Sequence, residues 1–167
     1  MIEIAKVRYK GWPNSYRVAN DKIELIALGD VGPRVIRYGF RSGVNQFVEF
    51  AEHAGLTGGD EWRIYGGHRL WHSPENLNRT YYPYNQAVEV IIREVGLTLV
   101  QQEESTTKLQ KKMSIEMDNK TGAVTIMHSI KNCGLCCFLS WAFGMAWLTR
   151  ITVSKARPVD LNSSSNL

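Results

Sequence analysis

The chain has 167 residues, a formal net charge of +4, and 44% hydrophobic and 22% charged residues. This length suits a single domain with one continuous core, and this composition excludes an intrinsically disordered protein. Basic residues are dispersed among acidic ones rather than gathered in a run, so we expect no nucleic-acid partner.

The amino-terminal segment and the cysteines favour a cytoplasmic protein. Charged residues interrupt the apolar ones within residues 1–20, so this segment lacks the apolar core of a secretory signal. The three cysteines lie in one apolar stretch, where we expect reduced thiols that fill the core rather than a redox or zinc site; they are Cys133, Cys136 and Cys137. The stretch 133–148 is shorter than the roughly 20 residues that a membrane-spanning helix needs, so we expect no membrane contact.

Apolar residues that alternate with a period of two predict strands in the first part of the chain. Residues 22–28 carry apolar side chains at both parities, which predicts a strand that is partly buried on both faces. Gly32 and Pro33 mark a turn, and residues 34–40 then predict a second strand.

The same alternation predicts four further strands, at residues 87–93, 97–101, 109–117 and 123–131. Gly96 separates the first two of these strands, and the turn-forming residues 118–122 join the last two as a hairpin. No stretch of ten residues shows the spacing of an amphipathic helix. The sequence therefore predicts an all-β fold, an antiparallel β-sandwich or barrel, with a single domain at residues 1–157 and a polar disordered tail at 158–167.

A long segment at residues 50–83 interrupts the strands and is too long for an idle connection. Within it, residues 61–75 combine aromatic rings, imidazoles, a guanidinium and carboxylates. Sugar-binding sites need this mixture, because flat rings cover the C–H face of a sugar and charged groups bond its hydroxyls. Gly66 and Gly67 would let the backbone approach such a ligand closely.

A purely structural interpretation of residues 61–75 stays open beside this one. In it, Gly66 and Gly67 form a bulge, Trp71 fills the core, and Arg69 pairs with a buried acid. Irregular segments on rigid sheets favour binding without proving it.

Histidines supply the candidate acid and base groups. His68 or His72 could exchange a proton near neutral pH. Their spacing would suit a metal pair on a helix, but no third ligand stands at a suitable distance, so we expect no metal and no cofactor. His128 shares strand parity with apolar residues and should project inward, as a core residue unless its face lines the same cavity as His68. Glu103 and Glu104 are expected to be solvated at a strand end.

Four motifs, taken in order, resemble an uncharacterised bacterial family within the galactose-mutarotase-like superfamily, which includes the aldose epimerases. They lie at residues 11–20, 30–36, 61–75 and 128–132, and the match runs from about residue 5 to about residue 143. Its most specific piece is the run Gly-Gly-His-Arg-Leu-Trp at residues 66–71.

The resemblance implies a large two-sheet supersandwich whose concave face binds a sugar or a sugar phosphate. In the aldose and hexose-phosphate epimerases, a glutamate takes the proton of the anomeric hydroxyl while a histidine protonates the ring oxygen. The stretch 67–69 is similar in place to a His-Gly-x-Ala-Arg motif of the hexose-phosphate epimerases. This likeness implies that His68 and Arg69 contact the sugar.

The sequence departs from these epimerases in two ways. Trp141 stands in the region where they place their acid histidine. The resemblance implies that their catalytic glutamate comes from a carboxy-terminal half for which this sequence shows no counterpart, so we expect a sandwich that is incomplete at its carboxy-terminal end. Exposed sheet edges would then favour pairing with a second copy of the chain.

Three functions follow as alternatives. The first is an aldose 1-epimerase-like isomerase with His68 and His128 as catalytic residues and six substrate contacts, namely Trp62, Tyr65, Arg69, Trp71, His72 and Glu75. The second is a non-catalytic carbohydrate-binding module that stacks sugars on Trp62, Tyr65 and Trp71. The third is a truncated domain without an independent function.

Overall fold

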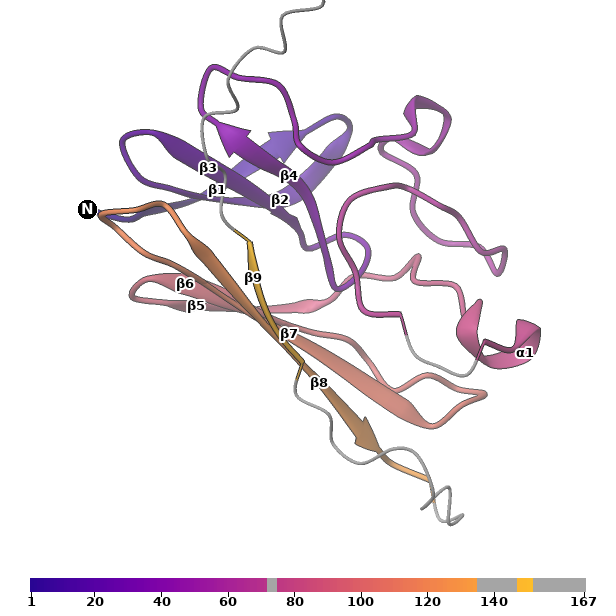
Figure 1. The fold of residues 1–167 in the computed structure, drawn as a ribbon. Helices are drawn as coiled ribbons and strands as arrows, with labels where there is room; N and C mark the ends of the chain where they lie inside the picture. The colour runs from indigo at the N-terminus through magenta and orange to yellow at the C-terminus, as the bar shows by residue number, and fades with distance from the viewer. Residues whose placement is uncertain (72–74, 135–146, 152–167) are drawn as a thin grey trace, which may run out of the picture.

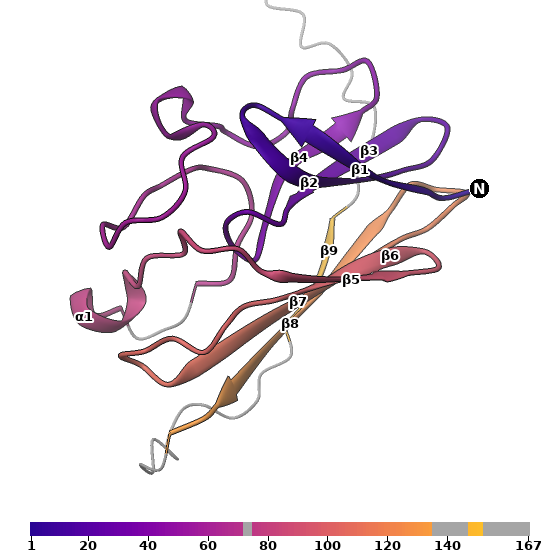
Figure 2. The same ribbon diagram turned by 180° about the vertical axis from the view of Figure 1, so that it is seen from behind.

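The computed structural model describes residues 1–71, 75–134 and 147–151, and its strands form two layers (Figure 1, Figure 2). The first sheet contains β1 (Glu3–Tyr9), β2 (Trp12–Ala19), β3 (Ile23–Leu28) and β4 (Arg34–Phe40). The second sheet contains β5 (Glu89–Arg93), β6 (Gly96–Val100), β7 (Leu109–Met117), β8 (Val124–Asn132) and β9 (Trp147–Ile151). All neighbouring strands are antiparallel and follow chain order, which confirms the prediction of a mostly β, antiparallel fold.

The main hydrophobic core lies between the two sheets. Every second side chain of a strand points to the same face. Alternate residues of β3 and of β7 therefore face this core. Burial of each large aliphatic side chain in this core contributes roughly 1.5–3 kcal/mol. The buried members from the strands are Val18, Ile23, Leu25, Ala27, Val35, Tyr38, Leu97, Leu99, Met113, Ile115, Met117, Val124 and Ile126.

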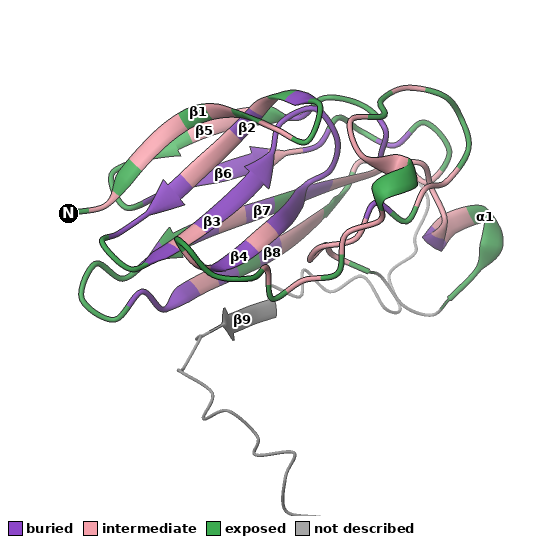
Figure 3. Ribbon diagram, turned by 90° about the horizontal axis from the view of Figure 1, so that it is seen from above, coloured by how far each residue is buried: buried purple, intermediate pink, exposed green. Residues whose placement is uncertain are grey.

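The outer face of the first sheet carries a second apolar cluster. Ile26 and Leu28 of β3 point to this face and pack with Ile36 of β4, Trp12 and Tyr65. Because Leu25 and Ala27 face the main core, β3 is buried on both sides, as the apolar residues at both parities predicted (Figure 3). The prediction for residues 22–28 is confirmed.

The predicted strands agree with the structure to within two residues at each end. The alternation did not reveal β1, β2 or β9. β1 is an edge strand whose side chains are all exposed or half-buried, and charged residues occupy several of its positions, so its apolar face is blurred in the sequence. Of β2, Trp12, Ser15, Val18 and Ala19 are buried at irregular spacing.

A long connecting segment, residues 41–88, joins β4 to β5 and lies at one end of the sandwich (Figure 1). Among its described residues the only helical elements are the 3-10 turn η1 (Ala51–His53) and the single-turn helix α1 (Leu77–Thr80). It is longer than the irregular segment predicted at residues 50–83. Isolated bridges from Gly66 to Glu49 and from His68 to Val35 hold it against itself and against β4.

Several expectations concern residues outside the described ranges. These are the thiols of Cys136 and Cys137, the position of Trp141, the side chain of His72 and the tail at 158–167. Cys133 is half-buried and carries a free thiol. Within the described ranges, no helix is long and apolar enough to cross a membrane.

Candidate functional site

Two glycines set the path of the connecting segment beside β4. Gly66 and Gly67 have positive φ values of +95° and +71°. A Cβ on Gly66 would lie 2.2 Å from the carbonyl oxygen of Val48, and a Cβ on Gly67 would lie 2.3 Å from that of Val35. We expected these glycines to admit a ligand to the backbone; the structure shows that they admit another part of the chain instead.

This close approach fixes the position of His68. Its backbone N–H donates to the carbonyl of Val35 over 2.7 Å, and the N–H of Val35 donates to the carbonyl of His68 over 3.0 Å. The imidazole of His68 stacks on Phe47, with ring centroids 6.3 Å apart and planes 23° from parallel. The backbone of β4 and the ring of Phe47 therefore both orient this histidine.

His68 meets the second candidate histidine across the two sheets. The Nε2 atoms of His68 and His128 lie 2.9 Å apart, and the ring centroids lie 5.0 Å apart. His128 is 3% exposed and projects from the inner face of β8, as its strand parity predicted. The structure thus brings together the two residues that the sequence singled out for acid–base chemistry.

The surroundings lower the pKa of both imidazoles. Burial, followed by the neighbouring His68, lowers the pKa of His128 to about 4. Burial, followed by the charge of Arg34, lowers the pKa of His68. In the neutral pair one Nε2 donates a hydrogen bond and the other accepts it, so the pair can pass a proton between its rings.

An open cleft of about 480 Å³ lies beside the histidine pair and is walled by aromatic rings and arginines. Trp71 is 39% exposed, so it is not a core residue. The rings of Trp62, Trp71 and Tyr81 meet edge to face, with centroids 5.1–6.3 Å apart. No Asp or Glu is among the described residues that line this cleft.

Arg69 lies among these rings. Its guanidinium carbon is 4.0 Å from the centroid of Trp71 and 5.3 Å from that of Trp62. Burial lowers the pKa of Arg69 to about 10, which still leaves it cationic at neutral pH. Its Nη1 is buried and finds no hydrogen-bond partner among the described residues, so the expected pairing with a buried acid is not seen there.

Arg34 is a second arginine of the cleft, and sequence reasoning missed it. It begins β4 and is only 2% exposed. Its Nη1 donates to the carbonyl of Gly66, whereas Nε and Nη2 are buried without a partner in the described part of the chain. Burial, followed by the charge of Arg69, lowers the pKa of Arg34 to about 9. An arginine at the start of the strand predicted at residues 34–40 was the signal that could have identified it.

A buried polar network lies behind the cleft. Lys111 of β7 donates to Oε1 of Glu104 over 2.7 Å and to the hydroxyl of Tyr84. Glu104 is 0% exposed, which corrects the expectation that it is solvated; only Glu103 lies at the surface. The inward parity of Lys111 on β7 buries this charge pair.

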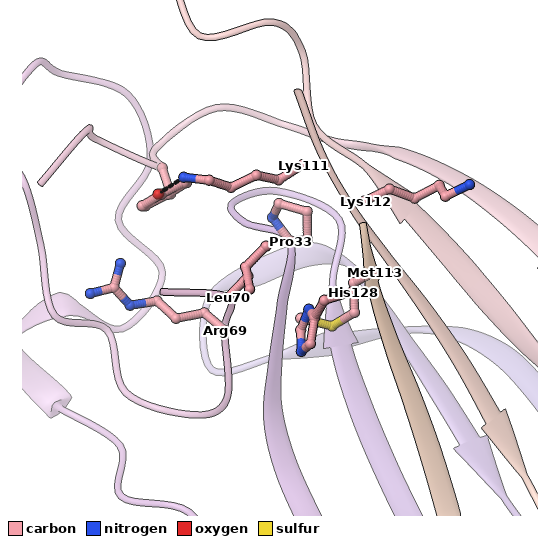
Figure 4. A pocket seen from close by; sticks show the side chains of 8 residues that line it. Pro33, Arg69, Leu70, Lys111, Lys112, Met113 and His128 are labelled. Atoms are coloured by element: carbon pink, nitrogen blue, oxygen red, sulfur yellow. Dashed lines mark hydrogen bonds between the residues drawn. The ribbon is translucent and has the colours of Figure 1, made fainter. Parts of the chain in front are cut away.

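A cavity of about 10 Å³, the space of about one water molecule, separates this network from the histidine pair. Figure 4 shows that the Arg69 guanidinium points away from the His128 imidazole. The stem of Arg69 and the ring of His128 line the same cavity. The guanidinium of Arg69, however, lies over the ring of Trp71, whereas Nε2 of His128 contacts Nε2 of His68. The cleft and the histidine pair are therefore neighbours rather than one open hollow.

Two of the remaining predicted contacts lie elsewhere. Tyr65 is 1% exposed, and its hydroxyl donates to Asn85 over 2.8 Å, so it is a core residue and not the sugar-stacking surface that we expected. Glu75 is not among the residues that line the cleft, although it accepts a hydrogen bond from the hydroxyl of Tyr81, which does line it. His72 lies outside the described residues. Within the described ranges, no group of three or more His, Cys, Asp and Glu residues could hold a metal ion.

No protein-family model matches the chain, and neither a curated protein nor a solved structure matches it. What the molecule binds is therefore inferred from the cleft and the histidine pair.

Proposed function

We propose that the protein binds a carbohydrate in the cleft around Arg69 and that its two sheets derive from a galactose-mutarotase-like supersandwich. The observation that supports the binding proposal is the cluster of exposed Trp71 with half-buried Trp62 and Tyr81 around a guanidinium. Aromatic faces cover the C–H surface of a pyranose ring, while the guanidinium donates hydrogen bonds to its hydroxyl oxygens. The cleft volume of about 480 Å³ lies within the usual range for small-molecule sites.

The composition of the cleft favours binding over catalysis. Mutarotation needs a base for the anomeric hydroxyl, and the described lining offers no carboxylate for this role. The buried carboxylate of Glu104 already accepts hydrogen bonds from Lys111 and Thr107. A carbohydrate-binding module is therefore the function that we propose first.

Calorimetric titration of the full chain with a panel of neutral and phosphorylated sugars tests this proposal. We expect binding in the millimolar range or tighter, and Trp71→Ala should weaken it by about 10-fold through the loss of stacking. Leu77→Ala is the matched control, because Leu77 is 79% exposed on α1 and is not part of the cleft lining. Absence of heat and of a tryptophan fluorescence change with every sugar would contradict the proposal.

The contact between His68 and His128 favours one second candidate, an aldose 1-epimerase-like isomerase. In this scheme His68 gives one proton to the ring oxygen and is reprotonated through Nε2 of His128, while water takes the proton of the anomeric hydroxyl and returns it to the histidine pair through the solvent. Polarimetry on fresh α-glucose and α-glucose 6-phosphate would show faster equilibration than in buffer. A rate equal to that of buffer, or one unchanged in His68→Gln, would exclude this activity.

A further inference from the structure

The cleft has an imbalance of charge. Arg34 and Arg69 both line it, and no acidic side chain does so among the described residues. Because both arginines line one cleft, the charge of Arg69 adds to burial in lowering the pKa of Arg34. The nearby buried carboxylate of Glu104 is paired with Lys111 and does not neutralise them.

Buried donors on these arginines are left without partners. Arg34 has an exposed fraction of only 2%, and its Nε and Nη2 have no hydrogen-bond partner in the described ranges. Nη1 of Arg69 is also buried and has no hydrogen-bond partner among the described residues. Burial of a cationic donor without an acceptor is costly, so a group that supplies oxygen acceptors and negative charge would stabilise this arrangement.

We propose that the ligand of the cleft is an anionic sugar whose phosphate or carboxylate oxygens are held between Arg34 and Arg69. This inference rests on the proposed carbohydrate binding and names its substrate class. A guanidinium presents paired N–H donors in one plane, which matches two oxygens of a phosphate or a carboxylate. Trp71 and Tyr81 then stand beside the charged group, where they stack against the sugar ring.

Titration with matched neutral and charged ligands tests the inference. The probes are glucose, glucose 6-phosphate, glucuronate and inorganic phosphate, each added to the full chain at low and at high salt. We expect an anionic sugar to bind about 10- to 100-fold more tightly than glucose, because hydrogen bonds to charged groups are strong. This preference should shrink at high salt, since the salt screens the charges. The two anionic sugars separate a phosphate site from a carboxylate site.

Four variants separate charge from folding. Arg69→Met should abolish the preference for the charged sugar and leave the affinity for glucose almost unchanged, while Arg69→Lys should keep part of the preference. Arg34→Lys should weaken the charged sugar without removing a buried cation. Arg93→Met is the matched control, because Arg93 is exposed on β5 and is not part of the cleft lining. Urea unfolding of each variant confirms that it is folded.

The outcomes distinguish this inference from the proposed function. Equal affinity for glucose and both anionic sugars, with no effect of salt or of Arg69→Met, would overturn the anionic ligand and leave carbohydrate binding intact. Binding of inorganic phosphate that Arg69→Met abolishes, with no binding of any sugar, would support the anion site and overturn the carbohydrate proposal.

Discussion

Nε2 of His68, in the connecting segment, lies 2.9 Å from Nε2 of His128, on β8. Only one proton can occupy the line between these atoms, so protonation of both rings would leave two donors facing each other. Together with burial, this contact lowers the pKa of His128, whereas burial and the charge of Arg34 lower the pKa of His68.

Acid should weaken the fold through this pair. The pKa of His128 is about 4 in the folded protein and about 6.5 in the unfolded chain, so the unfolded state binds more protons between these values. The stabilising contribution of His128 is complete above pH 6.5, falls as the pH is lowered, and is lost by about pH 4. Across this pH range the contribution of His128 to the free energy of unfolding falls by about 3 kcal/mol.

Urea unfolding at intervals between pH 7.5 and pH 4 measures this effect. His128→Gln should show a shallower loss of unfolding free energy over that window than the unmodified chain, because carboxylates contribute equally to both. Parallel curves for the two proteins would show that His128 is not responsible.

Lys111 should stabilise the fold mainly by neutralising the buried carboxylate of Glu104. Lys111→Met leaves the carboxylate of Glu104 buried without its cation, and we expect it to cost about 3–5 kcal/mol of unfolding free energy. The double variant Glu104→Leu with Lys111→Met should recover most of this loss, since neither member of this buried charge pair remains.

Lys112→Met supplies the matched control for the same strand. Lys112 is exposed, and Figure 4 shows its side chain pointing away from that of Lys111. Its replacement should change stability by less than about 0.5 kcal/mol. A double variant no more stable than Lys111→Met would argue against the charge pair as the cause.

Gly67→Ala should displace the connecting segment. The new Cβ would lie 2.3 Å from the carbonyl oxygen of Val35, at a φ of +71° that disfavours side chains. We expect the free energy of unfolding, measured by thermal denaturation, to fall by about 1–3 kcal/mol. The imidazole resonances of His68 should also change in the NMR spectrum.

Gly58→Ala separates backbone strain from the clash. Gly58 has a similar φ of +66°, but a Cβ there would meet no atom within 4 Å. It should therefore cost less than Gly67→Ala and leave the His68 resonances in place. Equal losses in the two variants would show that the approach to Val35 is not critical.

The alternation of apolar residues predicted those strands that bury a clear face. It predicted β4 and β7 to the residue, yet it missed β1, whose edge position leaves no fully buried side chain. Parity also predicted that His128 points inward. It could not show that His68 is the partner of His128, because that contact depends on how the two sheets pack.

The candidate site was predictable in composition more than in detail. The density of aromatic and basic residues around Arg69 marked a segment that lines the cleft, but it could not tell the exposed ring of Trp71 from the buried ring of Tyr65. Glu104 is buried only because the turn after β6 brings it to Lys111 on β7. Pairings of this kind arise from tertiary packing and leave no periodic trace in the sequence.

Each sheet is built from consecutive strands of the chain. Either sheet can therefore form from contacts between neighbouring hairpins, independently of the other sheet. The meeting of His68 with His128 belongs to a later event, in which the finished layers come together. A substitution that loosens this docking would be expected to separate His68 from His128 while both sheets keep their hydrogen-bonded ladders.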